Sequence, residues 1–164
     1  MLSAESASGK YPIEAVQMMS RIIVQVESDP HYRDVIEASH TPAEATVPDA
    51  IFCGMRRVAG LLHVAATVTY TSSDYSTLRA ARERPSAPIV SLTPEIRTAR
   101  RLALVWGVHS VHTHEVKHAP DMVDNACQTA LREEFARSGD TVVIAAGMPF
   151  GAIGNTNLLR IAQI

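Results

Sequence analysis

The sequence has little of what membrane, nucleic-acid-binding and disulfide-rich proteins use. Among its 164 residues are two cysteines and one tryptophan, and fifteen Lys plus Arg against seventeen Asp plus Glu give a net charge of −2. This near-neutral balance excludes a global attraction to nucleic acid or to an anionic membrane. No apolar run approaches the roughly twenty residues that span a bilayer, and the start lacks a secretory-signal pattern. We therefore expect no nucleic-acid partner, no membrane partner and no export, and any anion site must be local.

The two cysteines, Cys53 and Cys127, lie in apolar, helix-like stretches and belong to no CxxC or other metal-type spacing. We interpret both as small buried apolar residues. The sequence alone leaves a disulfide between them open, and the simplest localisation is a reducing cytoplasm.

What is present is the composition of one soluble globular domain, 46% hydrophobic and 20% charged, with enough length to bury a core. A helical period begins at Tyr11, where Pro12 suits a first helical position, and ends near Asp29 and Pro30. Residues 31–48 contain two prolines and no sustained period, which indicates a short helix followed by a linker.

Helices and strands then alternate, beginning with a helix for which Asp49 is the expected N-cap and Leu62 the end. Strands are expected at 65–70, 88–92, 108–112, 141–146 and 158–164, and helices at 75–84, 94–105 and 120–137. This alternation predicts parallel strands with crossover helices, and the last two strands, with no helix between them, should be antiparallel. The expected fold class is α/β: a three-layer α/β/α architecture on a mixed sheet of about five strands, mostly parallel with the last strand antiparallel.

A loop at the carboxyl end of the first expected strand is a candidate ligand site. Thr71, Ser72, Ser73 and Ser76 place four hydroxyls and free backbone amides at a strand-to-helix turn, which suits a phosphate. The same residue types also serve simply to cap a helix, and the carboxylate of Asp74 would repel a phosphate. Both interpretations stay open at this point.

A second loop, residues 147–155, carries glycines at 147, 151 and 154 that would let the backbone approach a ligand closely. A long hairpin connection explains the same residues equally well. Neither GxxxxGK[ST] nor GxGxxG is present, so nucleotide binding of those types has no support.

Four histidines, His109, His112, His114 and His118, raise the question of a zinc site. They lie at a strand end and in a loop, with no HExxH motif and no cysteine partner, so solvated surface histidines are the better interpretation. No GxSxG elbow occurs either, so the residues indicate neither a metal site nor a catalytic centre.

Residues 1–16 are similar to the MLSxExAxGxYPxEAV stretch that pyruvate kinases carry at the last helix of their catalytic barrel. Residues 70–73, with 78–82 and 84–89, look like the effector-loop strand and helix of that family. Residues 149–151 and 154–158 resemble its closing loop and strand. Over nearly its whole length the chain resembles the carboxy-terminal, regulatory domain of a pyruvate kinase.

The resemblance implies a division into residues 1–30, a remnant of the last barrel helix, residues 31–48, a linker, and residues 49–164, the C-terminal α/β domain. In the family, the barrel and its cap domain carry the sites for phosphoenolpyruvate, ADP, magnesium and potassium that produce pyruvate and ATP in glycolysis. No catalytic residue, metal or cofactor is therefore expected in this chain. Its abrupt start is expected to be the point where a longer chain has been cut.

The family's carboxy-terminal domain binds a sugar phosphate or nucleotide effector and contributes to a tetramer. By resemblance, the effector phosphate is expected at Thr71, Ser72, Ser73, Asp74, Tyr75 and Ser76. The closing effector loop is expected at Gly151, Ala152, Ile153 and Gly154.

Two departures from the family limit the choice of effector. Asp74 stands where the family often has glycine, and the basic and aromatic side chains that bind fructose 1,6-bisphosphate are replaced near Glu115 and Met122. We therefore do not expect that ligand. A free-standing phosphate- or nucleotide-binding module and a small hydrolase or metal enzyme remain as alternatives.

The helix at 11–27 packs on the barrel in the family. In this chain it would expose Ile13, Val16 and Ile23 unless it finds a new partner, so we expect a homo-oligomer or disorder of the helix.

Overall fold

The computed structural model describes residues 1–39, 42–149 and 154–164. The chain divides into two compact units, Met1–Thr41 and Pro42–Ile164. Within the described residues, no helix has both the length and the apolar character needed to cross a membrane.

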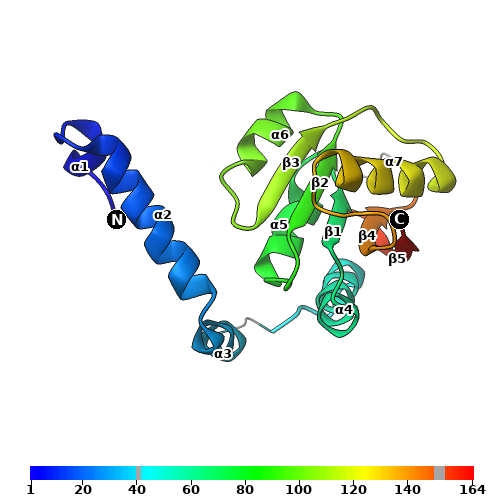
Figure 1. Ribbon diagram of the computed structural model, residues 1–164. Helices are drawn as coiled ribbons and strands as arrows, with labels where there is room; N and C mark the ends of the chain where they lie inside the picture. The colour runs from blue at the N-terminus through cyan, green and yellow to red at the C-terminus, as the bar shows by residue number, and fades with distance from the viewer. Residues whose placement is uncertain (40–41, 150–153) are drawn as a thin grey trace. The chain divides into compact units, whose positions relative to one another are not determined.

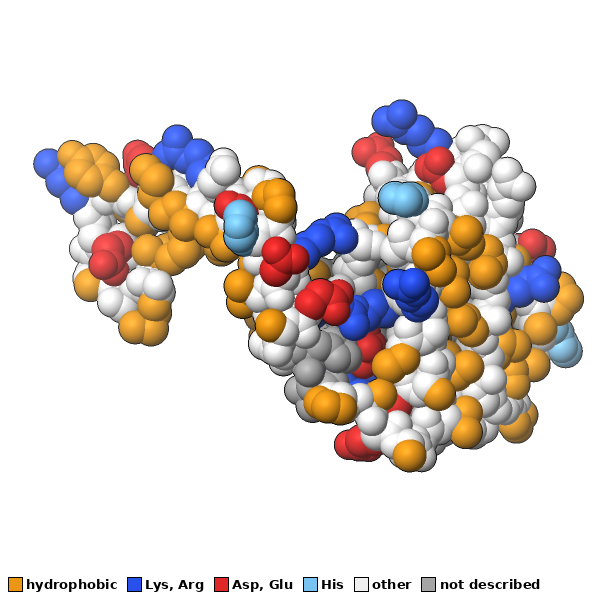
Figure 2. All heavy atoms as spheres, turned by 90° about the horizontal axis from the view of Figure 1, so that it is seen from below, with side chains coloured by type: hydrophobic (Ala, Val, Ile, Leu, Met, Phe, Trp, Pro, Cys, Tyr) orange, Lys and Arg blue, Asp and Glu red, His pale blue; other side chains and the backbone are white. Residues whose placement is uncertain are grey.

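The first unit consists of three helices, α1 (Ala4–Ala7), α2 (Pro12–Glu27) and α3 (Pro30–Ala38). The helix predicted after Tyr11 is confirmed as α2, with Pro12 at its start. Asp29 caps α3 by accepting a hydrogen bond from the backbone N–H of His31 at 2.8 Å. None of the residues in these helices is buried. Figure 2 shows hydrophobic side chains along this helical unit, on the left.

The second unit is built on a five-stranded sheet with the order β3-β2-β1-β4-β5 (Figure 1). Its strands are β1 (Ala66–Tyr70), β2 (Ile89–Thr93), β3 (Val108–His112), β4 (Thr141–Gly147) and β5 (Thr156–Gln163). The first four strands are parallel, and β5 pairs antiparallel with β4. The predicted α/β class with a mixed sheet is confirmed.

Helices cover both faces of this sheet. They are α4 (Val47–Leu62), α5 (Tyr75–Arg82), α6 (Ile96–Leu102) and α7 (Ala119–Arg132). On one face, Phe52 and Met55 of α4 and Ala80 of α5 pack with Ile89 and Val143 of the sheet. Another core cluster joins α7 to the sheet; it includes Met122, Ala126, Val68, Val90 and Ile144. Alternate residues of β4 therefore contribute to two separate cores.

The predicted N-cap of α4 is wrong. Thr46 caps the helix, its hydroxyl accepting from the backbone N–H of Asp49 at 3.4 Å, and Val47 and Pro48 form the first helical positions. Asp49 lies within the first turn and is fully buried. A proline near the start of a helix is tolerated because its missing N–H would have no partner there, and this allows the helix to begin before Asp49.

The last crossover helix ends earlier than predicted, at Arg132 and not at Arg137. The N–H groups of Phe135 and Ala136 both return to the carbonyl oxygen of Ala130, at 2.9 and 3.2 Å. Glu134 takes a left-handed backbone conformation with φ of 61°. Such a reversal normally uses glycine, so a sequence whose next glycine is Gly139 gives no local signal for it.

A buried carboxylate ties α4 to α5. Asp49 is 0% exposed and forms ion pairs with Arg79 and, at 2.7 Å, with Arg82. Its Oδ2 also accepts a hydrogen bond from the backbone N–H of Glu44 at 2.7 Å. A buried charge is tolerated only with partners of this kind, so the start of α4, the segment before it and α5 are held together.

A chain of buried hydroxyls anchors the first turn of α5 to the sheet. Thr77 shares hydrogen bonds with Thr69 of β1 at 2.8 Å and with Ser91 of β2 at 2.7 Å. All three residues are 0% exposed. Because each hydroxyl can both donate and accept, the chain satisfies polar groups that would otherwise be costly to bury.

Both cysteines are free and only partly buried. The disulfide that the sequence left open is not formed. Burial raises the pKa of the Cys53 thiol, with Glu83 adding to the effect, and burial also raises the pKa of Cys127. Both therefore remain thiols at neutral pH.

We predict that Thr77→Val destabilises the chain by about 1–3 kcal/mol, because the substitution keeps the volume and leaves the Thr69 and Ser91 hydroxyls without their shared partner. Chemical denaturation followed by circular dichroism measures the change. Ser86→Ala, which removes a hydroxyl at an exposed position of the same unit, is the control and should change stability by less than about 0.5 kcal/mol. Equal stability of Thr77→Val and the wild type would contradict the role of the hydroxyl chain.

Candidate functional site

A pocket of about 680 Å³, including its open mouth, lies at the carboxyl edge of the parallel strands. The residues that follow β1, β2 and β3 line it, together with Gly147 at the end of β4 and residues 154–156 at the start of β5. It lies beside the β1–β4 pair, where the strand order reverses. Ligands of open α/β sheets bind at this kind of edge.

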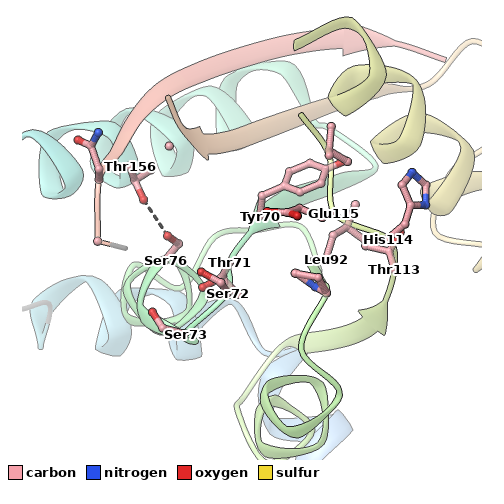
Figure 3. Close-up of a pocket in the computed structure, with 15 residues that line it drawn as sticks. Tyr70, Thr71, Ser72, Ser73, Ser76, Leu92, Thr113, His114, Glu115 and Thr156 are labelled. Carbon is pink, nitrogen blue, oxygen red and sulfur yellow. Dashed lines mark hydrogen bonds between the residues drawn. The ribbon is translucent and has the colours of Figure 1, made fainter. Parts of the chain in front are cut away.

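One wall of the pocket is a turn rich in hydroxyls. Thr71, Ser72 and Ser73 follow β1 and line the pocket (Figure 3). Within the described part of the chain, none of their three hydroxyls has a hydrogen-bond partner, and none of the three is a fully buried atom. Ser76 also lines the pocket, but its hydroxyl shares a hydrogen bond of 2.8 Å with Thr156.

The first turn of α5 opens on this wall without a side-chain cap. Asp74 occupies the N-cap position with φ of 70° and makes no capping hydrogen bond. Its carboxylate binds Arg101 of α6 at 2.7 Å instead. The carboxylate of Asp74, which was expected to repel a phosphate, is therefore paired with a cation. Asp74 is not part of the pocket lining.

The opposite wall is formed by the loop after β3, residues 113–116, with Thr113, His114 and Glu115 (Figure 3). Tyr70 also contributes to the lining; its hydroxyl donates to the carbonyl of Met122 at 2.7 Å and accepts from Asn125 at 3.2 Å. Burial raises the pKa of Tyr70 above its ordinary value. The tyrosine therefore stays neutral and joins the pocket to α7.

The structure brings together most of the described residues predicted for the site. Four of the six turn residues, Thr71, Ser72, Ser73 and Ser76, line the pocket, whereas Asp74 and Tyr75 do not. Gly154 lines it from the other side. Gly151, Ala152 and Ile153 of the predicted effector loop lie outside the described residues.

Sequence reasoning from the residues missed the wall at 113–116 and the role of Thr156. The rule that carboxyl ends of parallel strands share one edge applies to β3 as well as to β1 and β4, so it could have placed His114 and Glu115 there. The bond between Ser76 and Thr156 joins residues 80 positions apart. No local pattern could have revealed it.

A close backbone contact at the pocket rim explains one of the predicted loop glycines. A Cβ atom at Gly147 would overlap the carbonyl oxygen of Asn155. Gly147 therefore allows the end of β4 and the start of β5 to meet at the rim, whereas any larger residue would push them apart.

Two of the four histidines, His109 and His112, have partners outside the pocket. His109 Nε2 lies 3.0 Å from Glu133 Oε2, and His112 Nε2 lies 3.1 Å from the carbonyl of Pro94. Across residues 1–39, 42–149 and 154–164, no group of three or more His, Cys, Asp or Glu side chains could hold a metal ion.

Comparison with known proteins identifies the family. A model described as "Pyruvate kinase, alpha/beta domain" matches residues 49–162. Over its whole length the chain is 44% identical to a pyruvate kinase of Methylorubrum extorquens, 40% to one of Geobacillus stearothermophilus and 33% to one of Clostridium acetobutylicum. It covers 34%, 28% and 35% of these proteins, so it spans about a third of the length of the curated relatives it matches. The resemblance seen in the sequence is confirmed, and the chain belongs to the pyruvate kinase family, with the α/β domain at residues 49–162.

Proposed function

We propose that the α/β unit is the allosteric domain of a pyruvate kinase and binds a phosphate-bearing effector in the pocket at the sheet edge. The observation that carries the proposal is the set of three hydroxyls, Thr71, Ser72 and Ser73, that line this pocket without a partner among the described residues. Thr71 as a residue is more than nine-tenths buried, but its hydroxyl oxygen is not one of the buried polar atoms without a partner, so it opens to the pocket. Hydroxyls that line a pocket without a partner can donate hydrogen bonds to a ligand there.

The electrostatics of the turn support a phosphate as that ligand. The N-terminal N–H groups of a helix and its dipole favour an anion. No Asp74 cap competes for these groups, and Arg101 offsets the charge of Asp74. A phosphate supplies several strong acceptor oxygens, which matches a wall of hydroxyl and amide donors.

The parent reaction of the family, phosphoryl transfer from phosphoenolpyruvate to ADP, is proposed for the whole protein and not for this chain alone. The chain corresponds to about a third of its relatives. We propose that it regulates this step of glycolysis in a cytoplasmic enzyme and that the reaction itself, with its magnesium and potassium ions, takes place on the parts that it does not contain.

The composition of the pocket favours an effector with one phosphate, such as a sugar monophosphate or a nucleoside monophosphate. The lining contains the carboxylate of Glu115 and no Lys or Arg among the described residues. A carboxylate accepts hydrogen bonds from sugar hydroxyls or amino groups but repels a second phosphate.

Thr71→Val should weaken binding of ribose 5-phosphate about tenfold, because a hydrogen bond to a charged group contributes about 1.5–3 kcal/mol. Isothermal titration calorimetry with ribose 5-phosphate, glucose 6-phosphate and AMP measures the affinity. Ser76→Ala should also weaken binding. Thr156→Val keeps the Ser76 hydroxyl and frees it from its partner, so this variant should not weaken binding. Wild-type chain that binds none of these compounds, or Thr71→Val and Ser76→Ala chains that bind as wild type does, would refute the phosphate site.

Glu115→Gln should reduce the preference for ribose 5-phosphate over fructose 1,6-bisphosphate about fivefold, because it removes like-charge repulsion without changing shape. The ratio of the two dissociation constants at fixed ionic strength is the measurement. Glu134→Gln, an exposed glutamate that does not line the pocket, is the matched control. An unchanged ratio in Glu115→Gln would show that Glu115 does not select the ligand.

We further propose that the chain self-associates through α2. Ile13, Val16 and Ile23 are 69%, 53% and 47% exposed, and apolar surface of this kind is buried when it finds a partner. A second copy supplies the same apolar face, so a homo-oligomer would bury it.

Sedimentation velocity should show concentration-dependent association of the chain, which Ile13→Asp with Ile23→Asp abolishes because charged residues are costly to bury in an apolar contact. Hydrogen exchange in residues 12–27 should slow as the concentration rises. A strictly monomeric chain whose α2 is nevertheless fully protected from exchange would contradict this proposal.

A further inference from the structure

Tyr75 precedes Ser76 of the pocket lining but does not line the pocket itself. The guanidinium carbon of Arg79 lies 4.6 Å from the centre of the Tyr75 ring. On the pocket side the ring is close to Gly154, because a Cβ atom added to that glycine would lie 3.9 Å from the ring. The ring therefore has a cation contact with the second turn of α5 and lies near one residue of the pocket lining.

Arg79 is held in this place by the buried carboxylate of Asp49. Arg79 pairs with Oδ1 of Asp49, whereas Arg82 and the backbone N–H of Glu44 occupy Oδ2. The two oxygens thus have separate partners, and a movement of Arg79 would leave one of them without a cation in a fully buried site. The ion pair with Asp49 therefore fixes the guanidinium of Arg79 beside the Tyr75 ring. The Arg79 side chain is only 18% exposed, so contact with solvent does not determine its position.

The same cluster reaches the segment that precedes α4. Glu44 contributes its backbone N–H to Asp49, and its carboxylate lies 3.7 Å from Arg79. Glu44, Asp49, Arg79 and Tyr75 therefore form a continuous series of contacts within the α/β unit, which ends at the residue before Ser76 of the pocket lining.

We propose that Asp49 and Arg79 are positioning residues that hold Tyr75 against the pocket rim, and that this series of contacts couples ligand binding to the order of residues 42–46. The proposal rests on the phosphate site proposed above and adds to it a route by which occupancy is felt at the entrance of the domain. Tyr75 thereby acts through Ser76, the next residue and part of the pocket lining, and not as a direct ligand of the phosphate.

Coupling of this kind is reciprocal, since a ligand that orders the rim must bind more weakly when the rim is loosened. Loss of the ring or of its cation should lower affinity even though neither touches the ligand. A phenyl ring should suffice, because a guanidinium–aromatic contact depends on the face of the ring and not on its hydroxyl.

The test measures ribose 5-phosphate affinity by calorimetry and amide exchange in residues 42–48 with and without the ligand, on the full chain. Tyr75→Leu and Arg79→Gln should each weaken binding about fivefold to tenfold, consistent with a cation–π contact of about 1 kcal/mol or more. They should also abolish the slowing of exchange at residues 42–48 that the ligand produces in the wild type. Tyr75→Phe should restore both the affinity and the slowing, which a merely bulky residue would not.

Arg100→Gln, which changes an exposed arginine of α6 outside the pocket, is the matched control and should bind as the wild type does. Circular dichroism establishes that each variant is folded; Tyr75 and its replacements lie at a partly exposed position, so Tyr75→Leu remains informative even if Arg79→Gln unfolds. If the wild type binds ribose 5-phosphate and Tyr75→Leu binds it equally well, the positioning role is wrong and the phosphate site stands. If the wild type binds no phosphate compound, both proposals fail. An equal loss of affinity in Tyr75→Phe and Tyr75→Leu would also refute the proposed coupling through Tyr75.

Discussion

The pocket at the carboxyl edge of the sheet depends on the parallel register of β1 with both of its neighbours. Val68 lies opposite Val90 of β2 and Ile144 of β4, so the three central strands end at the same level. The chain must therefore leave β1 at an edge that it shares with the turns after β2 and β4. The helix after β1, α5, covers one face of the sheet, and the helix after β3, α7, covers the other. The connections from β1 and β3 to these helices therefore diverge and leave space between them. The pocket is a consequence of this topology before any side chain is considered.

The side chains at this edge then decide what the space can hold. Most buried side chains of the sheet and helices in this domain are apolar, whereas the turn after β1 presents hydroxyls that have no partner among the described residues. Deeper in the same region, Thr69, Thr77 and Ser91 satisfy one another. Thr69, Thr77 and Ser91 are thus paired in the buried sheet, whereas the hydroxyls of Thr71, Ser72 and Ser73 have no partner among the described residues where the pocket opens. The same residue type therefore stabilises the sheet at one position and is left available to the proposed ligand at a nearby one.

Much of this fold could be predicted from the sequence, and the residues where prediction failed share one cause. Alternating helical and strand periods located all five strands, since apolar runs such as residues 141–146 leave few alternatives. Asp49 and Asp74 were misjudged because capping and repulsion rules use neighbours in sequence. Their actual partners, Arg79 and Arg101, lie about thirty residues away along the chain. Glu115 and Thr156 entered the pocket by the same kind of long-range contact, which periodicity does not encode.

The charges around α5 explain why a site for an anion does not need a dedicated lysine or arginine in its lining. Asp49 and Asp74 are both close to α5, and each is paired with an arginine that does not line the pocket. With these charges paired, the field at the first turn of α5 is set by the helix dipole and by hydroxyl and amide donors. Such donors are neutral, so the proposed site would bind one phosphate without attracting further anionic groups. The acidic wall at Glu115 would add selectivity to the same proposed site, because it favours a ligand whose remaining part is uncharged and rich in hydrogen-bond donors.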